Sequence, residues 1–211
     1  MTLAPFPAQP TETPWPERDW PRGELPASAD AARLTALLDK AFDPAAHDAM
    51  GEPHAFLAVQ RGRIVAERYA GGEHTAASTY PSWSMAKSIT QLLIGFLAAE
   101  GAIDVAAPRA APEWRGADDP RAKLTWTQLL HMSSGLEFRE DYVDGSVSDT
   151  LEMLFAGGKD DVAAYAANKP LAHWPDTVFN YASGTSNILA RALGQVVGGG
   201  AAGMRDFMEK R

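Results

Sequence analysis

The 211-residue sequence predicts an α+β (α/β) fold, in which one β-hairpin is followed by a larger set of helices. Two short apolar runs between residues 55 and 69 flank a polar turn, whereas the apolar residues that follow recur mainly at helical spacing. Apolar residues make up 45% of the chain, which is enough for a packed core. The length suits one domain, or a domain and part of another.

Residues 1–26 contain seven of the fifteen prolines, together with Trp15 and Trp20. Proline fixes φ and has no amide proton to donate, so this segment is predicted to be extended. We expect a strap on the surface of a domain that spans residues 27–211, anchored by its two indoles. A disordered tail is the alternative.

The first helix is expected to begin near Ser28, an N-cap candidate, with Asp30 in its first turn. The hairpin comes next, with strands at Ala55–Val59 and Ile64–Tyr69 and with Gly62 in the turn between them. A lone hairpin is marginally stable, so this sheet looks unfinished. Either helices alone cover the two strands, or the sequence is the front part of a longer chain.

Six further helices are predicted from apolar spacing and from the Gly and Pro residues between them. The first contains the most apolar stretch of the chain and is expected to be buried on nearly every side. The segment Gly198–Gly203 has the spacing of a dinucleotide-binding loop but follows a helix, so we interpret it as a helix-terminating loop. The predicted helices are Ser84–Glu100, Trp126–His131, Asp149–Phe155, Asp161–Asn168, Thr185–Val197 and Met204–Lys210.

Composition excludes several classes of function. The chain carries 27 acidic and 19 basic residues, which disfavours binding to nucleic acid or to anionic lipid. It has no cysteine for a disulfide or a thiolate metal site, and no run of about 18 apolar residues that could span a membrane. Its five histidines lack ligand spacing, so we expect neither metal nor cofactor. No secretory signal is visible, and a cytoplasmic protein is expected.

The strongest chemical signal is the pair Ser84 and Lys87, at the opening of the most apolar helix. Residues three apart share one face of a helix, so the amine can reach the hydroxyl. Desolvation at this position lowers a lysine pKa, as a general base requires, and the helix N-terminus offers amides to a developing oxyanion. The alternative is an ordinary N-cap serine beside a solvent-exposed lysine.

A second proton carrier is predicted at Tyr181, which precedes a helix together with Ser183. Tyr80 has the same spacing to a serine, but it leads into the same helix as Ser84, so Tyr181 is the better candidate. A core tyrosine is the structural alternative. Glu137 and Glu140 are expected in a solvated loop, in which Asp141 and Tyr142 are candidates for the substrate rim.

Three of these segments resemble motifs of a known superfamily. Ser84-Met85-Ala86-Lys87 resembles the nucleophile motif of the serine β-lactamases and penicillin-binding proteins. Leu129–Leu136 (LLHMSSGL) resembles the loop that follows it in the branch related to class C β-lactamases. Pro170–Pro175 leading to Tyr181-Ala182-Ser183-Gly184 resembles the tyrosine motif of 6-aminohexanoate-dimer hydrolases and related esterases.

The resemblance runs from about residue 50 to the C-terminus and implies the N-terminal part of a β-lactamase/transpeptidase-like fold. It implies Ser84 as acylated nucleophile, Lys87 as base and Tyr181 as proton shuttle, with the Ser84 amide as half of the oxyanion hole. Ser183, Tyr142 and Asp141 are expected at the substrate. Class C β-lactamases have asparagine at the position of Ser183, which favours a small amide or ester over a β-lactam.

The family's third motif, a strand near its C-terminus that carries Lys or His and gives the second oxyanion amide, is absent from the 211 residues. This agrees with the unfinished sheet, and we expect a truncated chain. A non-catalytic binding module and an inactive fragment are therefore the alternatives to an active hydrolase. The expected partners are a small-molecule substrate and either a complementary C-terminal segment or a second copy of the chain.

Overall fold

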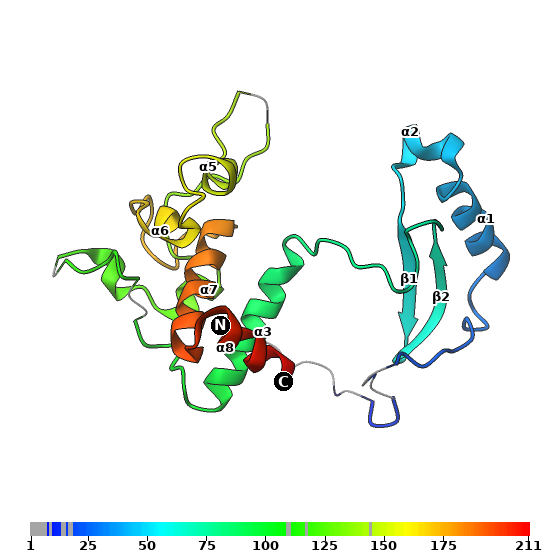
Figure 1. Cartoon of the computed structure of the whole chain (residues 1–211), viewed down its shortest axis with the longest axis horizontal. Coiled ribbons are helices and arrows are strands. Elements are labelled where there is room, and N and C mark those ends of the chain that lie inside the picture. Colours follow the sequence, from blue (N-terminus) through cyan, green and yellow to red (C-terminus); the bar gives the residue numbers. More distant parts are fainter. Residues whose placement is uncertain are drawn as a thin grey trace. The chain divides into compact units, whose positions relative to one another are not determined.

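A computed structural model of the chain describes residues 8, 10–13, 16, 19–108, 111–116, 118–143 and 145–211. The chain forms two compact units, Met1–Pro81 and Ser82–Arg211. The first contains the predicted hairpin and the second contains most of the helices (Figure 1).

The hairpin of the first unit confirms the strand prediction. Strands β1 (Ala55–Gln60) and β2 (Arg63–Tyr69) pair antiparallel, with an irregular register between Ala58 and Val59. Arg61 and Gly62 both have positive φ, 49° and 68°, which a tight two-residue turn of this hand requires. Among the described residues, this sheet has two strands.

Helix α1 (Ala31–Ala41) lies alongside the hairpin in Figure 1. Its N-cap is Asp30 rather than Ser28, so the predicted start was two residues early. The Asp30 carboxylate accepts a hydrogen bond from the amide of Arg33 at 2.9 Å. Asp39 of this helix forms an ion pair with Arg68 of β2 at 2.5 Å, and this contact ties helix to sheet.

Two short helices follow α1 that the sequence pattern did not predict. The 3-10 turn η1 (Pro44–Ala46) is capped by Asp43, whose carboxylate accepts from the amide of Ala45 at 2.9 Å. Helix α2 (His47–Met50) continues from it directly. Both are too short for an apolar periodicity to show.

Part of the proline-rich segment lies beside β2. The Ile64 amide donates to the Pro21 carbonyl at 2.8 Å, and the Gly23 amide donates to the Ile64 carbonyl at 3.0 Å. Arg22 also forms an ion pair with Glu67. Trp15 lies outside the described residues and Trp20 is half exposed, so the strap over residues 1–26 stays a prediction.

The second unit holds the hydrophobic core. Its central element is helix α7 (Ser183–Val197), which packs against five other helices of the unit. Apolar residues from all along the unit form one buried cluster, which includes Leu93, Leu129, Met153 and Ile188. The helices around α7 are α3 (Met85–Ala99), α4 (Trp126–Leu130), α5 (Asp149–Phe155), α6 (Val162–Ala167) and α8 (Gly200–Glu209).

Two helix predictions need correction. Helix α3 buries one face only: Leu93, Ile94 and Leu97 are buried, but Ile89 and Leu92 are about half exposed. Helix α8 begins at Gly200, four residues before the predicted start. The predicted loop Gly198–Gly203 is therefore much shorter, because the positive φ of Gly198 and Gly199 reverses the chain within two residues.

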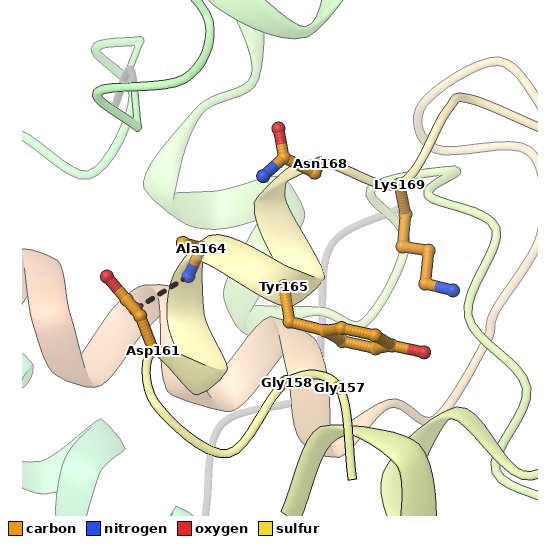
Figure 2. A pocket seen from close by; sticks show the side chains of 7 residues that line it. All are labelled: Gly157, Gly158, Asp161, Ala164, Tyr165, Asn168 and Lys169. Atoms are coloured by element: carbon orange, nitrogen blue, oxygen red, sulfur yellow. Dashed lines mark hydrogen bonds between the residues drawn. The ribbon is translucent and has the colours of Figure 1, made fainter.

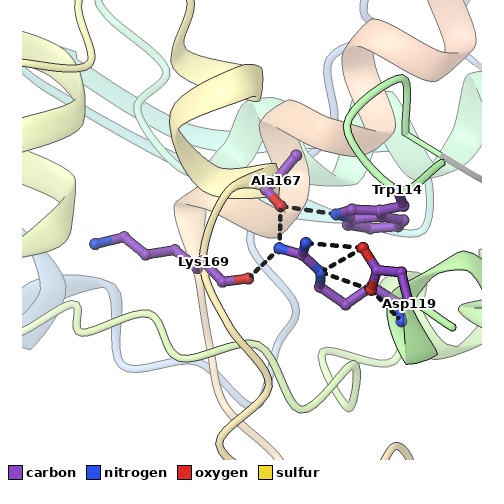
Figure 3. A network of polar contacts seen from close by, with 5 residues as sticks. Trp114, Asp119, Ala167 and Lys169 are labelled. Atoms are coloured by element: carbon purple, nitrogen blue, oxygen red, sulfur yellow. Dashed lines mark hydrogen bonds and ion pairs between the residues drawn. The ribbon is translucent and has the colours of Figure 1, made fainter. Parts of the chain in front are cut away.

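The loop before α4 is fixed to the end of α6 by a polar network (Figure 3). This loop includes the 3-10 turn η2 (Pro120–Lys123), which the sequence pattern did not predict. Buried Trp114 donates its indole N–H to the Ala167 carbonyl at 2.7 Å. Arg121 donates to the same carbonyl at 3.1 Å and to that of Lys169 at 2.9 Å. Carbonyls at the end of a helix lack partners within it, so these bonds satisfy them.

A second network joins α5, α6 and residue 139. Asp149 is buried and accepts from the Arg139 amide at 2.8 Å, from the Tyr165 hydroxyl at 2.7 Å and from the Lys169 ammonium. Burial by itself raises the pKa of Asp149, but these three donors outweigh it, so the pKa lies below its ordinary value. Lys169 and Tyr165 stand together in Figure 2.

Replacing Asp149 with Asn should lower the free energy of unfolding by about 3 kcal/mol at pH 7, because a half-buried Lys169 ammonium loses its counter-charge. A carboxylate whose pKa is lowered by folding stabilises the protein above its ordinary pKa and loses that contribution as the pH falls. Urea denaturation should therefore show the difference between wild type and Asp149→Asn shrinking below about pH 4.

The matched control is the double variant Asp149→Asn/Lys169→Met. It leaves no uncompensated charge, so we expect it to be more stable than Asp149→Asn alone. Equal unfolding midpoints for wild type and Asp149→Asn at pH 7 would contradict this role of Asp149.

Candidate active site

The motifs around residues 133 and 181 come together because two loops of the second unit pair. Leu136 forms a β-bridge with Leu171, and the Asn180 amide donates to the Met132 carbonyl at 2.8 Å. The Asn180 side chain also donates to the Phe138 carbonyl at 3.0 Å. This pairing places the residues that follow each loop, Glu140 and Tyr181, on the same side of the unit.

Gly135 is required where the two loops approach most closely. Its φ is +79°, and a Cβ at this position would lie 2.2 Å from the His173 carbonyl oxygen. Its own carbonyl accepts from the amides of Ala172 and His173 at 2.9 and 3.2 Å. A side chain at residue 135 would therefore push the two loops apart.

Ser84 lies at the N-terminus of α3, where the chain enters the helix through an unusual backbone conformation. Trp83 has a φ of +45°, which is uncommon for a residue with a side chain, and its indole is 79% exposed. Ser84 is itself exposed. One turn into the helix, half-buried Lys87 places its Nζ 2.9 Å from the Ser84 Oγ, as the three-residue spacing predicts.

The start of α7 meets the start of α3 at Lys87. The Lys87 Nζ donates to the Ser183 Oγ at 3.0 Å and lies 5.1 Å from the centre of the Tyr181 ring. The Lys87 ammonium thus contacts the face of the Tyr181 ring. This region brings together four of the predicted site residues, namely Ser84, Lys87, Tyr181 and Ser183.

Glu140 belongs to this cluster, although the sequence pattern predicted a solvated loop residue. Its carboxylate accepts from the Ser183 amide at 2.5 Å, from the Ser183 hydroxyl at 2.8 Å and from the Tyr142 hydroxyl at 3.2 Å. Glu140 and Ser183 are 43 residues apart, and no spacing rule links them. Only the loop pairing described above brings them together.

A cavity of about 360 Å³ opens beside these groups. Tyr142 is one of its lining residues, and its predicted role at a substrate rim stays a prediction. Asp141 is exposed and is not among the lining residues, so the structure does not support its predicted place at the rim. The wall is largely apolar and includes Trp83, Met153 and Leu154.

The comparisons with known proteins decide the family. The family model described as Beta-lactamase matches residues 38–211 of the chain. The chain belongs to the β-lactamase family. The match covers the hairpin, Ser84, Lys87 and Tyr181.

A solved structure extends this finding to the fold. The protein described as "Putative 6-aminohexanoate-dimer hydrolase from Bacillus anthracis" superimposes with a TM-score of 0.56 at 22% sequence identity. The alignment covers 77% of this β-lactamase-family chain and 42% of that protein. The two proteins thus share a fold that contains both helices and strands. This chain spans less than half of the length of its structural relative. No curated protein matches the chain significantly.

Tyr80, the alternative to Tyr181, belongs to the first unit of this β-lactamase-family chain. Its ring stacks on those of His54 and His74, and its hydroxyl lies 3.2 Å from the His74 Nδ1. Tyr181 belongs to the same unit as Ser84 and Lys87, and its ring contacts the Lys87 ammonium.

Two larger cavities of the β-lactamase-family chain are lined by none of the four residues gathered around Lys87. A cavity of about 470 Å³ beside α6 is lined by seven residues between 157 and 169, which include Tyr165 and Lys169 (Figure 2). The polar atoms of these two side chains already bind Asp149. The other cavity, of about 540 Å³, is lined by Trp174 and its neighbours. No group of three possible metal ligands occurs among the described residues. None of the described helices is long and apolar enough to cross a membrane.

Proposed function

We propose that this β-lactamase-family chain is a serine hydrolase that cleaves a small amide or ester through a covalent acyl-enzyme on Ser84. The observation that carries the proposal is the position of the Lys87 Nζ, within hydrogen-bond distance of Ser84 at the exposed N-terminus of a helix. A serine hydroxyl is a weak nucleophile, and an adjacent amine is one of the groups that activates it.

In the first half-reaction, the Lys87 amine removes the Ser84 proton as Oγ attacks the substrate carbonyl. The Ser84 amide, at the positive end of α3, donates to the oxyanion that forms. As the tetrahedral intermediate collapses, the leaving group takes a proton delivered from Lys87 through Tyr181. This leaves an acyl ester on Ser84.

In the second half-reaction, water attacks that ester. The basic tyrosine–lysine pair removes a proton from the water, and Ser84 regains its own proton as the acid departs. Hydrolysis therefore returns the three side chains to their starting state.

The cavity beside Ser84 supports a small acyl group with an apolar body. Trp83, Met153 and Leu154 offer apolar contacts along its wall. Ser186 and Asn187 of α7 also line this cavity. Tyr142, with its hydroxyl near Glu140, completes the rim.

A second candidate function is a module that is acylated but does not turn over. The alignment covers 42% of the structural relative. The Ser84 amide is one of the two donors that a complete oxyanion hole requires. Loss of one oxyanion donor costs on the order of 10²–10³ in rate. We propose that a complementary C-terminal segment, or a second copy of the chain, would restore the second oxyanion donor. We also propose a cytoplasmic location for the protein.

Burst kinetics with a p-nitrophenyl ester test the proposal on the 211-residue chain. We expect a burst of p-nitrophenol that corresponds to one equivalent per chain and is lost in Ser84→Ala. Steady release after the burst supports a hydrolase, whereas a burst alone supports the acylated module. Equal p-nitrophenol release by wild type and Ser84→Ala would overturn both.

A further inference from the structure

The carboxylate of Glu140 is hydrogen-bonded to groups that lead directly to Lys87. It accepts from the Ser183 hydroxyl at 2.8 Å, and the Ser183 Oγ in turn lies 3.0 Å from the Lys87 Nζ. Lys87 then reaches the Ser84 Oγ at 2.9 Å. An unbroken chain of hydrogen bonds thus connects a half-buried acid of the 139–143 loop to the nucleophile.

We propose that Glu140 is a positioning residue that fixes the direction of these hydrogen bonds and so orients Lys87 as a base. The inference rests on the proposed function of Ser84 and Lys87. It assigns Glu140 no contact with the substrate and no transfer of a proton.

The donors and acceptors of these groups fix the direction of each hydrogen bond. An ionised carboxylate only accepts hydrogen bonds, so the single proton of the Ser183 hydroxyl must point to Glu140. The Ser183 Oγ can therefore only accept from Lys87. A neutral lysine amine has two N–H bonds and one lone pair. With one N–H directed to Ser183, the lone pair is free to face the Ser84 hydroxyl.

Without the carboxylate this direction is lost. Glutamine at residue 140 presents an amide that can donate to Ser183 as well as accept from it. The Ser183 hydroxyl is then free to donate a hydrogen bond to the lone pair of Lys87. That lone pair can then no longer accept the proton of Ser84. The substitution is nearly isosteric, so the loss arises from the direction of the hydrogen bonds and not from the shape of the site.

Glu140 also has a structural role that the test must separate. Its carboxylate accepts from the Ser183 amide at 2.5 Å, and α7 has no side-chain cap of its own. A negative charge there stabilises the N-terminus of α7. The variant Ser183→Ala separates the two roles, because it removes the hydroxyl link to Lys87 and keeps the backbone amide that Glu140 caps.

The test is a double-mutant cycle on the rate of Ser84 acylation by a p-nitrophenyl ester, with ester binding measured separately from its saturation. We expect Glu140→Gln and Ser183→Ala each to slow acylation about tenfold to a hundredfold with ester binding unchanged. The double variant should be no more than about twofold slower than Ser183→Ala, because both substitutions break the same link. The control Glu137→Gln, at an exposed side chain three residues before Glu140, should match wild type.

Each contrary outcome has its own meaning. If the wild-type chain is acylated and Glu140→Gln is acylated at the same rate, the positioning role of Glu140 is overturned and the proposed function is not. Additive effects in the double variant, accompanied by a lower melting temperature for Glu140→Gln in both backgrounds, assign Glu140 to capping only. A wild-type chain that is not acylated overturns the proposed function and this inference together.

Discussion

Replacing Lys87 with alanine should slow the acylation of Ser84 by about 10³-fold. The reason is geometric, because the Lys87 Nζ lies within hydrogen-bond distance of the Ser84 Oγ and can take its proton. The nucleophile and its base act as a unit, so little of the ester turnover that depends on Ser84 should remain. Stopped-flow release of p-nitrophenol measures it.

Lys87→Arg separates a base from a fixed positive charge. A guanidinium remains protonated, so it can keep the electrostatic contribution of residue 87 but cannot accept a proton. We expect Lys87→Arg to be as slow as Lys87→Ala. Lys123→Ala, at an exposed lysine of the η2 turn, should react like wild type. Rapid acylation of Lys87→Arg would show that residue 87 acts through its charge.

Gly135→Ala should lower the free energy of unfolding by at least about 3 kcal/mol, the largest effect on stability that we expect from one methyl group. Two costs add at this residue. Its φ of +79° is unfavourable for alanine, and the added Cβ would meet the His173 carbonyl oxygen at 2.2 Å. Urea denaturation of the 211-residue chain measures the change.

The matched control for Gly135 is Gly101, which follows α3. Its φ of +75° is nearly the same, but nothing lies within 4 Å of an added Cβ. Gly101→Ala should therefore cost only about 1 kcal/mol. Equal losses for the two substitutions would show that the contact with His173 is not the cause. Because the same loop pairing carries Glu140 towards Ser183, Gly135→Ala should also slow acylation.

The sequence pattern predicted the elements whose signal is local. The hairpin followed from two apolar runs around Gly62, and α5 begins and ends at the predicted residues, Asp149 and Phe155. The proximity of Ser84 and Lys87 followed from the three-residue repeat of a helix face. The N-cap of α1 was misplaced because Ser28 and Asp30 are both good caps, and only the contact with the Arg33 amide distinguishes them.

The rest of the site depends on contacts between distant residues. No pattern in the neighbouring sequence identifies Glu140 as a site residue. Its partner Ser183 lies close to it because residues 132–139 pair with residues 170–180. The exposed face of α3 was missed for a related reason. Apolar spacing shows which residues can be buried, whereas the neighbouring elements decide which of them are. Tyr181 was singled out over Tyr80 because it belongs to a separate element.

The most direct test of the central claim is the intact mass of the chain after reaction with a fluorophosphonate, a probe that phosphonylates activated serines. We expect a single adduct on the wild-type chain, which peptide mapping places on Ser84, and no adduct on Ser84→Ala. An unmodified wild-type chain would show that Lys87 does not activate Ser84 in this chain. An adduct that persists on Ser84→Ala would place the reactive residue elsewhere, and either result would contradict the account.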